Sequence, residues 1–337
     1  MSRFCPFVLF EPYWGVPEKL FFIFLPPQAA SLDREKALMN VHMTNYIDLH
    51  THSTASDGIY SPTELLHKAQ EAGLRILALT DHDTTNGLEE AMQAAQTLNM
   101  ELIPGIEINT DIGGGEVHVL GYFLEFWRTE FQAVLKVLRD ARVRRGQRMV
   151  ELLKEHGVNI TWEHVREIAQ GSVGRPHVAE ALLEAGYVQT IGEAFDKYIG
   201  TGCFAYVPRY KLTPKDAVRL IASANGLPVI AHPIELPGLD ELRNWLPDLC
   251  EAGMVGLETY YGPYTPENER ELLVLAHEYN LIPTGGTDFH GPGIHPTPLG
   301  GRYVPFEAVE SLKAEAAKRH GKTPPPFELP PPEQEKM

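Results

Sequence analysis

The sequence predicts an α/β protein in which seven short strands form a closed barrel, interrupted by a mostly helical insertion. Short apolar runs alternate with helical patterns, which is typical of folds built on parallel strands. Several of these runs end in polar, ligand-type residues, and the active sites of α/β barrels lie at the carboxyl ends of their strands. Residues 126–205 break the alternation with a long helical stretch, which predicts the insertion.

The first part of the barrel is expected in residues 45–125. An exception to its parallel order is predicted where Asp111-Ile112-Gly113-Gly114-Gly115 forms a hairpin turn. If that turn has an even residue count, Glu107 and His118 project from the same face of the sheet. The strands of this part are predicted at Tyr46–Leu49, Arg75–Thr80, Leu102–Ile108 and Val117–Gly121, and its helices at Pro62–Ala72 and Gly87–Leu98.

The second part of the barrel is expected in residues 206–320, after the insertion. The insertion contains 11 Lys/Arg and 10 Asp/Glu, whereas the whole chain has a formal charge of −16. The insertion is therefore the part of the chain that repels a phosphate least. Five of its arginines, at positions 139, 142, 144, 145 and 148, crowd one helix and form either a solvated face or a phosphate contact. Strands are predicted at Pro228–Ala231, Met254–Thr259 and Leu281–Gly286, barrel helices at Pro214–Asn225 and Pro266–Tyr279, and shorter insertion helices near 161–170, 176–186 and 191–198.

The two ends of the chain differ in composition from its middle. Residues 1–44 are expected to be a poorly ordered extension, and the apolar run Phe21–Leu25 is too short to cross a membrane. Residues 321–337 form a Pro-rich acidic tail that is expected to be disordered. The sequence therefore predicts a protein that does not enter the membrane.

Charge and cysteine content restrict the possible partners and the compartment. Asp and Glu outnumber Lys and Arg by 45 to 29, which disfavours binding of an extended nucleic-acid duplex, because such binding depends on cations that neutralise phosphates. A small phosphorylated nucleotide or a short oligonucleotide remains compatible with this balance. The three cysteines are widely spaced and form no C-x-x-C, so we expect a reducing compartment, the cytoplasm.

Histidines and carboxylates gather at or just past the predicted strand ends. Residues i and i+2 of a strand share a face, so His50 and His52 can bind the same metal ion. Asp81 and Asp83 have a structural alternative as helix N-caps. Imidazoles and carboxylates without sulfur suit Zn, Mn or Fe, and the sequence predicts a polynuclear metal site. Its nine candidate ligands are His50, His52, Asp57, His82, Glu107, His118, His232, Asp288 and His290.

These motifs resemble those of the PHP (polymerase and histidinol phosphatase) family, and the resemblance spans about residues 46–320. The motifs are Asp48-Leu49-His50-Thr51-His52-Ser53, Thr80-Asp81-His82-Asp83, Pro104-Gly105-Ile106-Glu107, Glu116-Val117-His118, Ala231-His232-Pro233 and Thr287-Asp288-Phe289-His290. The resemblance implies a distorted seven-stranded barrel that binds two to three divalent ions. Gly174-Arg175-Pro176-His177-Val178-Ala179 and Tyr206-Val207-Pro208-Arg209 are similar to the branch of YciV- or TrpH-type phosphoesterases.

The resemblance also implies roles for the nine ligands. His50, His52, Glu107 and Asp288 would hold one ion; Glu107, His118 and His232 a second, with Glu107 bridging; and Asp57, His82 and His290 the third.

We expect Asp288 or Asp57 to accept a proton during hydrolysis. Arg175 is the first candidate for a second phosphate anchor, because a guanidinium binds phosphate oxygens bidentately. A structural role near the start of the helix is its alternative. His177 and Arg209 are further substrate-binding candidates.

Three classes of function follow. The first is a phosphatase that removes the 3′-phosphate from nucleoside 3′,5′-bisphosphates, and the second is a 5′→3′ exoribonuclease on short 5′-phosphorylated RNA. The third, a non-catalytic metal-bound module, predicts missing ligands, yet all nine positions are filled. The insertion disfavours histidinol phosphatase activity, and amide hydrolysis at a similar site stays open, because fold and metals do not fix the substrate.

Overall fold

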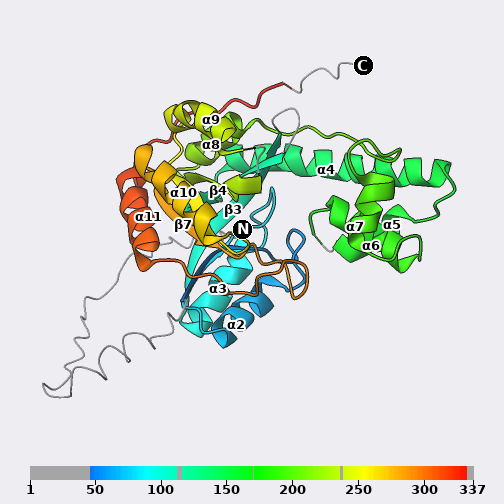
Figure 1. The fold of residues 1–337 in the computed structure, drawn as a ribbon, viewed down its shortest axis with the longest axis horizontal. Helices are drawn as coiled ribbons and strands as arrows, with labels where there is room; N and C mark the ends of the chain where they lie inside the picture. Colours follow the sequence, from blue (N-terminus) through cyan, green and yellow to red (C-terminus); the bar gives the residue numbers. More distant parts are fainter. Residues whose placement is uncertain (1–45, 112–115, 170, 236–237, 332–337) are drawn as a thin grey trace, which may run out of the picture. The chain divides into compact units, whose positions relative to one another are not determined.

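The computed structural model describes residues 46–111, 116–169, 171–235 and 238–331, so the predicted N-terminal extension lies outside the described residues. Seven strands in the order β1 to β7 form a nearly closed barrel surrounded by helices, which confirms the predicted fold class (Figure 1). The strands are β1 (Ile47–Thr51), β2 (Ile76–Leu79), β3 (Glu101–Asp111), β4 (Glu116–Tyr122), β5 (Leu227–Ile230), β6 (Gly256–Tyr261) and β7 (Ile282–Gly286).

The strand pairing explains how distant residues reach one end of the barrel. Strands β1 to β3 and β5 to β7 pair in parallel, whereas β4 runs antiparallel to both β3 and β5. Asn109 pairs with His118, so Glu107, two residues before Asn109, shares a face with His118 as predicted. A bridge between Thr51 and Phe289 brings the end of β1 next to the segment after β7.

Among the described residues six helices pack on the barrel, and three of them have clear sequence signals at their starts. Ser61, Thr213 and Thr265 accept a backbone hydrogen bond as N-caps, and each precedes a proline at the first helical position. Helices α9 and α11 have no counterpart in the ranges predicted above. The six are α2 (Pro62–Glu71), α3 (Leu88–Leu98), α8 (Pro214–Ser223), α9 (Leu239–Ala252), α10 (Pro266–Glu278) and α11 (Phe306–Arg319).

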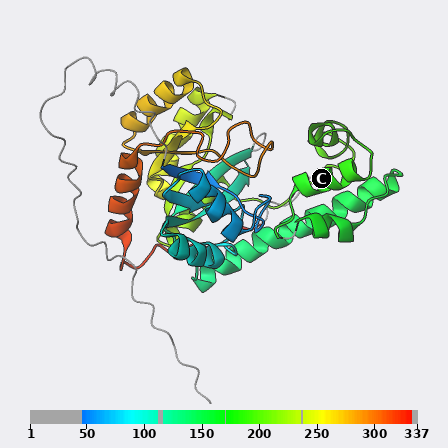
Figure 2. The same ribbon diagram turned by 90° about the horizontal axis from the view of Figure 1, so that it is seen from below.

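The segment between β4 and α8 forms a helical layer with a core of its own. Helix α4 (Thr129–Glu155) contributes Phe131 and Leu135 to the main core of the barrel and Met149 and Leu153 to the second core. Figures 1 and 2 show the shorter helices gathered beside the far end of α4. They are α5 (Trp162–Ala169), α6 (Arg175–Glu184), α7 (Ile191–Ala194) and the π-helical turn η1 (Phe195–Ile199).

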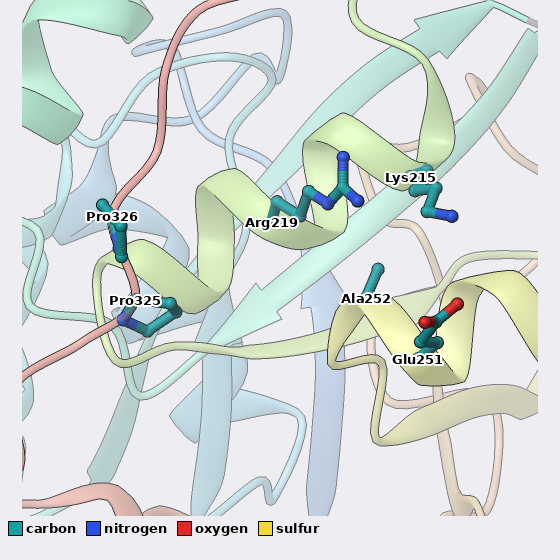
Figure 3. Close-up of a pocket in the computed structure, with 6 residues that line it drawn as sticks. All are labelled: Lys215, Arg219, Glu251, Ala252, Pro325 and Pro326. Atoms are coloured by element: carbon teal, nitrogen blue, oxygen red, sulfur yellow. The ribbon is translucent and has the colours of Figure 1, made fainter.

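The C-terminal segment packs against the barrel over residues 321–331, where the sequence predicted disorder. Phe327 and Leu329 are partly buried against the main core, and the Tyr210 hydroxyl donates a hydrogen bond to the Pro330 carbonyl at 2.7 Å. Pro-rich composition excludes a helix, but it does not prevent two apolar side chains from being buried. Figure 3 shows Pro325 and Pro326 beside α8 and α9, where a cavity of about 250 Å³ remains.

None of the helices in the described ranges has the length and apolar character needed to span a membrane.

Candidate metal centre

The nine predicted ligands meet at one end of the barrel. Most follow the carboxyl ends of parallel strands, and His118 joins them because β4 begins at that same end. Asp83, His232 and Asp288 have positive φ angles of 53°, 27° and 53°, so the backbone bends sharply at these strand ends. Such strained positions in residues other than glycine cluster at functional sites. The cluster is formed by His50, His52, Asp57, His82, Glu107, His118, His232, Asp288 and His290.

Glu107 lies at the centre of this cluster and is fully buried. Its Oε2 atom lies 3.2 Å from Nε2 of His50 and 3.2 Å from Nε2 of His52. Its Oε1 atom lies 2.8 Å from Nδ1 of His118 and 3.2 Å from Nε2 of His232. Nδ1 of His82 also lies 3.0 Å from Oε2, so the two oxygens face different sets of imidazoles, an arrangement in which one carboxylate can bridge two ions.

Asp288 completes the first group of donors. Its Oδ1 atom lies 3.0 Å from Nε2 of His52 and 3.2 Å from Nε2 of His50. One ligand atom from each of these residues and from Glu107 lies within 4.8 Å of all the others. Two donors that bind one ion at about 2.1 Å are at most about 4.2 Å apart, so small movements bring all four to a common ion.

Asp57 stands at the centre of a second group of donors, on the loop that follows β1. Its Oδ1 atom lies 3.3 Å from Nε2 of His290, and its Oδ2 atom lies 3.8 Å from Nε2 of His82. His52 joins them within the same 4.8 Å limit. A third group links His82, Glu107 and His118. His232 lies outside these groups but contacts Glu107, so the structure brings all the predicted ligands together.

Unpartnered polar atoms at the centre of the cluster show that it fits divalent cations. Burial of a polar atom without a hydrogen bond is costly, and native proteins avoid it unless a ligand or ion supplies the partner. Six buried ligand-type atoms have no hydrogen-bond partner among the described residues. They are Nε2 of His50, Nε2 of His52, Oδ1 of Asp57, Nδ1 of His82, Oε2 of Glu107 and Oδ1 of Asp288.

The electrostatics of the metal-free cluster agree with this interpretation. Burial alone would raise the pKa of Glu107, but the neighbouring imidazoles outweigh it and hold that pKa well below its usual range. Burial opposes protonation of His290, but Asp57 and Asp288 raise its pKa to about 9. Protonated imidazoles thus balance the carboxylates when no cation is bound, and a divalent ion would replace their protons.

Glu258 is a carboxylate that the sequence analysis did not assign to the site. It lies behind two of the ligands and fixes their orientation. Glu258 Oε1 lies 3.0 Å from Nδ1 of His50, and its Oε2 accepts a hydrogen bond from the His232 backbone at 2.7 Å. Such partners orient ligating imidazoles and tune metal affinity. Glu258 interrupts the apolar run of the predicted strand Met254–Thr259, and this buried charge was the signal that could have identified it.

Asp81 and Asp83 do not serve as helix N-caps, which was their alternative role in the sequence analysis. Helix α3 begins at Leu88 with Gly87 at the N-cap position. Asp81 instead accepts hydrogen bonds from the Ser53 backbone and from the Ser56 hydroxyl, both at 2.7 Å, and so holds the loop that leads to Asp57.

The three predicted substrate-binding residues form contacts with the protein itself. Arg175 is the first residue of α6, and its Nη2 atom lies 2.9 Å from Glu116 Oε1. Arg209 donates to Oδ2 of Asp83 at 3.2 Å and is buried. His177 accepts a hydrogen bond at Nδ1 from the backbone N–H at position 174, which caps the start of α6.

These contacts belong to a group of cations that we call the arginine cluster, which consists of Arg142, Arg145, Arg175, Arg209 and Lys211. Two carboxylates pair with it, since Asp83 also binds Arg142 at 2.7 Å and Glu116 binds Lys211 at 2.6 Å. Arg145 is buried and has no ion pair or side-chain hydrogen bond among the described residues. Burial and the neighbouring guanidinium groups lower its pKa well below the usual value.

The arginine cluster adjoins the metal centre. Arg142 bonds to Asn109, and Nδ2 of Asn109 lies 2.7 Å from Nε2 of His118. Glu116 Oε2 lies 3.8 Å from the same imidazole nitrogen. An excess of buried positive charge thus lies immediately beside the metal ligands.

A cavity of about 760 Å³ opens between the metal centre and the helices of the insertion. Asp57, His82, Asp288 and other ligands form its inner wall. Its outer wall consists mainly of apolar side chains of the insertion, together with two acidic residues and the predicted substrate-binding residue His177. The lining residues there are Ile168, Ala169, Pro176, His177, Glu180, Leu183, Glu184 and Ile191.

Comparison with known proteins agrees with this geometry. The family model described as the PHP domain matches residues 48–203. The chain is 35% identical over 251 residues to a protein of Haemophilus influenzae named 5′-3′ exoribonuclease, covering 74% of this chain and 92% of that protein. It is 32% identical over 250 residues to a protein of Chromobacterium violaceum named 3′,5′-nucleoside bisphosphate phosphatase, covering 73% and 88%.

A solved structure from Bifidobacterium adolescentis, described as that of a metal-dependent phosphoesterase, is similar over 80% of this chain and 96% of that chain. The two share 30% sequence identity with a TM-score of 0.73. The fold, the arrangement of ligand-type side chains and these similarities together confirm the resemblance seen in the sequence, and the chain belongs to the PHP-domain family.

Proposed function

We propose that the protein is a metal-dependent phosphoesterase that removes the 3′-phosphate from nucleoside 3′,5′-bisphosphates. Divalent ions held by the nine ligands would lower the pKa of water and stabilise the charge on the phosphate oxygens. Three overlapping groups of donors support two to three such ions, and donors without sulfur favour Mn, Zn or Fe.

The observation that carries this choice of substrate is the arginine cluster beside the metal centre. Its five cations, Arg142, Arg145, Arg175, Arg209 and Lys211, face only the carboxylates of Asp83 and Glu116 among the ion pairs of the described residues. A substrate with two phosphates would place one at the metal centre and bring the other to this unbalanced positive charge. His177, at the start of α6, would hold the Arg175 end of the cluster against the cavity.

The lining of the cavity supports a mononucleotide substrate in preference to an oligonucleotide. None of its described lining residues is Phe, Tyr or Trp, whereas proteins that bind single-stranded nucleic acid stack bases on aromatic side chains. Glu180 and Glu184 on its outer wall would repel the next phosphate of an oligonucleotide.

Exoribonuclease activity on short 5′-phosphorylated RNA is the second candidate. It is supported by the relative named 5′-3′ exoribonuclease, whose identity to this chain is 35%, against 32% for the relative named as a bisphosphate phosphatase. Both reactions would use the same metal centre and the same arginine cluster. They differ in whether the outer wall admits a second nucleotide.

Within this proposal Asp57 and Asp288 are the candidate proton acceptors. Both are ligand-type carboxylates that line the cavity, so either can reach a substrate there. The cytoplasm is the proposed compartment, since Cys203 and Cys250 are free thiols, as expected under reducing conditions.

A substrate panel tests the proposal. The manganese-loaded protein would be offered phosphoadenosine phosphate, a 5′-phosphorylated RNA oligomer, histidinol phosphate and a simple phosphodiester. We expect inorganic phosphate from the first and no mononucleotides from the second. Mononucleotides released from the RNA, with phosphoadenosine phosphate intact, would instead establish the exoribonuclease.

A further inference from the structure

A tenth ligand-type side chain lies at the metal centre, outside the nine positions that the sequence singled out. His295 follows β7 and lines the cavity next to Asp288 and His290. We propose that His295 is an additional metal ligand, which binds the same ion as His290. The inference depends on the metal centre and is independent of the substrate.

The distances suit a shared ion. Nε2 of His295 lies 3.9 Å from Oδ2 of Asp288, and the rings of His295 and His290 are stacked with centroids 4.8 Å apart and planes 30° apart. One ligand atom from each of these three residues lies within 4.8 Å of the other two. Donors at about 2.1 Å from one ion are at most about 4.2 Å apart, so a shift of under 1 Å closes the remaining gap.

The two oxygens of Asp288 face different partners, which leaves a place for this ligand. Oδ1 faces His50 and His52, whereas Oδ2 accepts a hydrogen bond from the Tyr261 hydroxyl at 3.1 Å and faces His295. His295 thus stands on the outer side of Asp288, between the buried ligands and the cavity.

His290 has one nitrogen available for the ion. Its Nδ1 lies 2.9 Å from the Asp288 backbone carbonyl, so Nε2, which faces Asp57, is the metal-binding atom. With Asp57 and His82, and with His52 assigned to the ion of Glu107 and Asp288, this gives three protein donors, and a three-donor site has room for another.

The backbone between β7 and His295 turns sharply at two glycines, which places the His295 side chain beside the other ligands. Gly291 and Gly293 have positive φ angles of 149° and 81°, and the Ile294 N–H donates to the Gly291 carbonyl at 3.3 Å. A Cβ on Gly291 would lie 2.6 Å from the Ile59 side chain, so the loop packs closely there. Residues with side chains could not follow this path without strain.

The His295 ring is also free to adjust. Its side chain is 30% exposed, and no hydrogen bond to a described residue holds it in place. A histidine with only a surface role would extend toward water, whereas this ring is stacked on a metal ligand.

Metal binding itself tests the proposal, without recourse to catalysis. Metal-free wild type and His295→Ala would be titrated with Mn²⁺ in a calorimeter, and the metal content would be measured after dialysis. We expect one ion, the one bound by His290, to lose about 10-fold or more in affinity, with the other sites unchanged. His295→Asp, which supplies a carboxylate oxygen in place of the imidazole nitrogen, should recover part of that affinity.

His277→Ala is the matched control, because His277 lies exposed on α10, outside the described groups of donors. Equal affinities and metal content for wild type and His295→Ala would overturn the proposal. An increase in substrate KM with unchanged metal binding would also overturn it, because the ring would then contact substrate and not metal. Circular dichroism confirms that each variant is folded before it is titrated.

Discussion

Glu107 and His118 are diagonal neighbours on one face of the β3–β4 pair, with Nδ1 of His118 2.8 Å from Oε1 of Glu107. The antiparallel pairing of β3 and β4 produces this contact, because the end of β3 and the start of β4 lie at the same end of the barrel. The other oxygen of Glu107 faces His50 and His52, which come from β1 and the residues after it. One side chain thus joins the donors of the two halves of the metal centre.

The orienting role of Glu258 gives the first prediction. Glu258→Gln keeps the size of the side chain but removes the negative charge beside Nδ1 of His50. Because such partners fix the orientation and basicity of a ligating imidazole, we expect Mn²⁺ affinity to fall about 10–100-fold, measured by calorimetry. Glu251→Gln, beside the cavity of Figure 3, is the control and should bind metal like wild type. Equal affinity of Glu258→Gln and wild type would show that Glu258 has no such role.

Arg145 is predicted to lower the stability of the fold and to contribute to substrate binding. Its buried charge has no carboxylate partner among the described residues, so Arg145→Met should raise the free energy of unfolding by about 1–4 kcal/mol in urea denaturation. In the proposed binding mode the arginine cluster holds the second phosphate, so the same variant should also raise KM for a nucleoside bisphosphate about 10-fold or more.

Arg142→Met is the matched comparison, with the opposite effect on stability. It removes one of the two guanidinium groups that bind Asp83, the other being that of Arg209, and it removes the partner of Asn109 Oδ1, so it should destabilise the fold by about 1–3 kcal/mol. Equal losses in the free energy of unfolding for Arg145→Met and Arg142→Met would contradict the prediction that only the paired arginine stabilises the fold.

The C-terminal segment should contribute to folding. Deletion of residues 325–337 removes the partly buried Phe327 and Leu329 and the hydrogen bond from Tyr210, which together should cost about 2–3 kcal/mol. Deletion of residues 332–337 alone removes none of these contacts and is the control. Thermal unfolding of the two truncated chains compares them, and equal melting temperatures would contradict the packing of this segment.

Protonation of the cluster predicts a pH dependence. Burial opposes the charged form of His290, but Asp57 and Asp288 raise its pKa to about 9 from 6.5. In the metal-free protein its stabilising contribution is therefore complete below pH 6.5 and is lost as the pH rises through about 9. Metal affinity should change in the opposite direction and increase up to about pH 9, because the ion displaces this proton. Melting curves and Mn²⁺ titrations between pH 6 and 9 check both trends, and a flat metal affinity would contradict them.

The fold and the ligand set could be predicted because both depend on local patterns. Apolar runs that end in histidine or carboxylate mark the strand ends, and barrel closure brings those ends together wherever they lie in the sequence. The shared face of Glu107 and His118 followed from the alternation of side chains along two antiparallel strands.

Other features depend on contacts that no local pattern contains. Arg175 and Arg209 have charges that suit phosphate, but the carboxylates that bind them lie 59 and 126 residues away in the sequence. Packing of Phe327 and Leu329 depends on a surface formed only by the folded barrel. His295 lacked the i, i+2 spacing that identified other ligands, and two glycines with unusual backbone angles bring it back to the cluster.

The most direct test of the metal centre is the number of divalent ions bound by the purified protein. Protein loaded with Mn²⁺, dialysed and analysed by mass spectrometry should contain two to three ions per chain, and chelation should abolish phosphoester hydrolysis. A Glu107→Gln sample, which lacks the central carboxylate, should contain fewer. Wild-type protein that retains no ion and hydrolyses the same substrates with and without chelator would contradict the account.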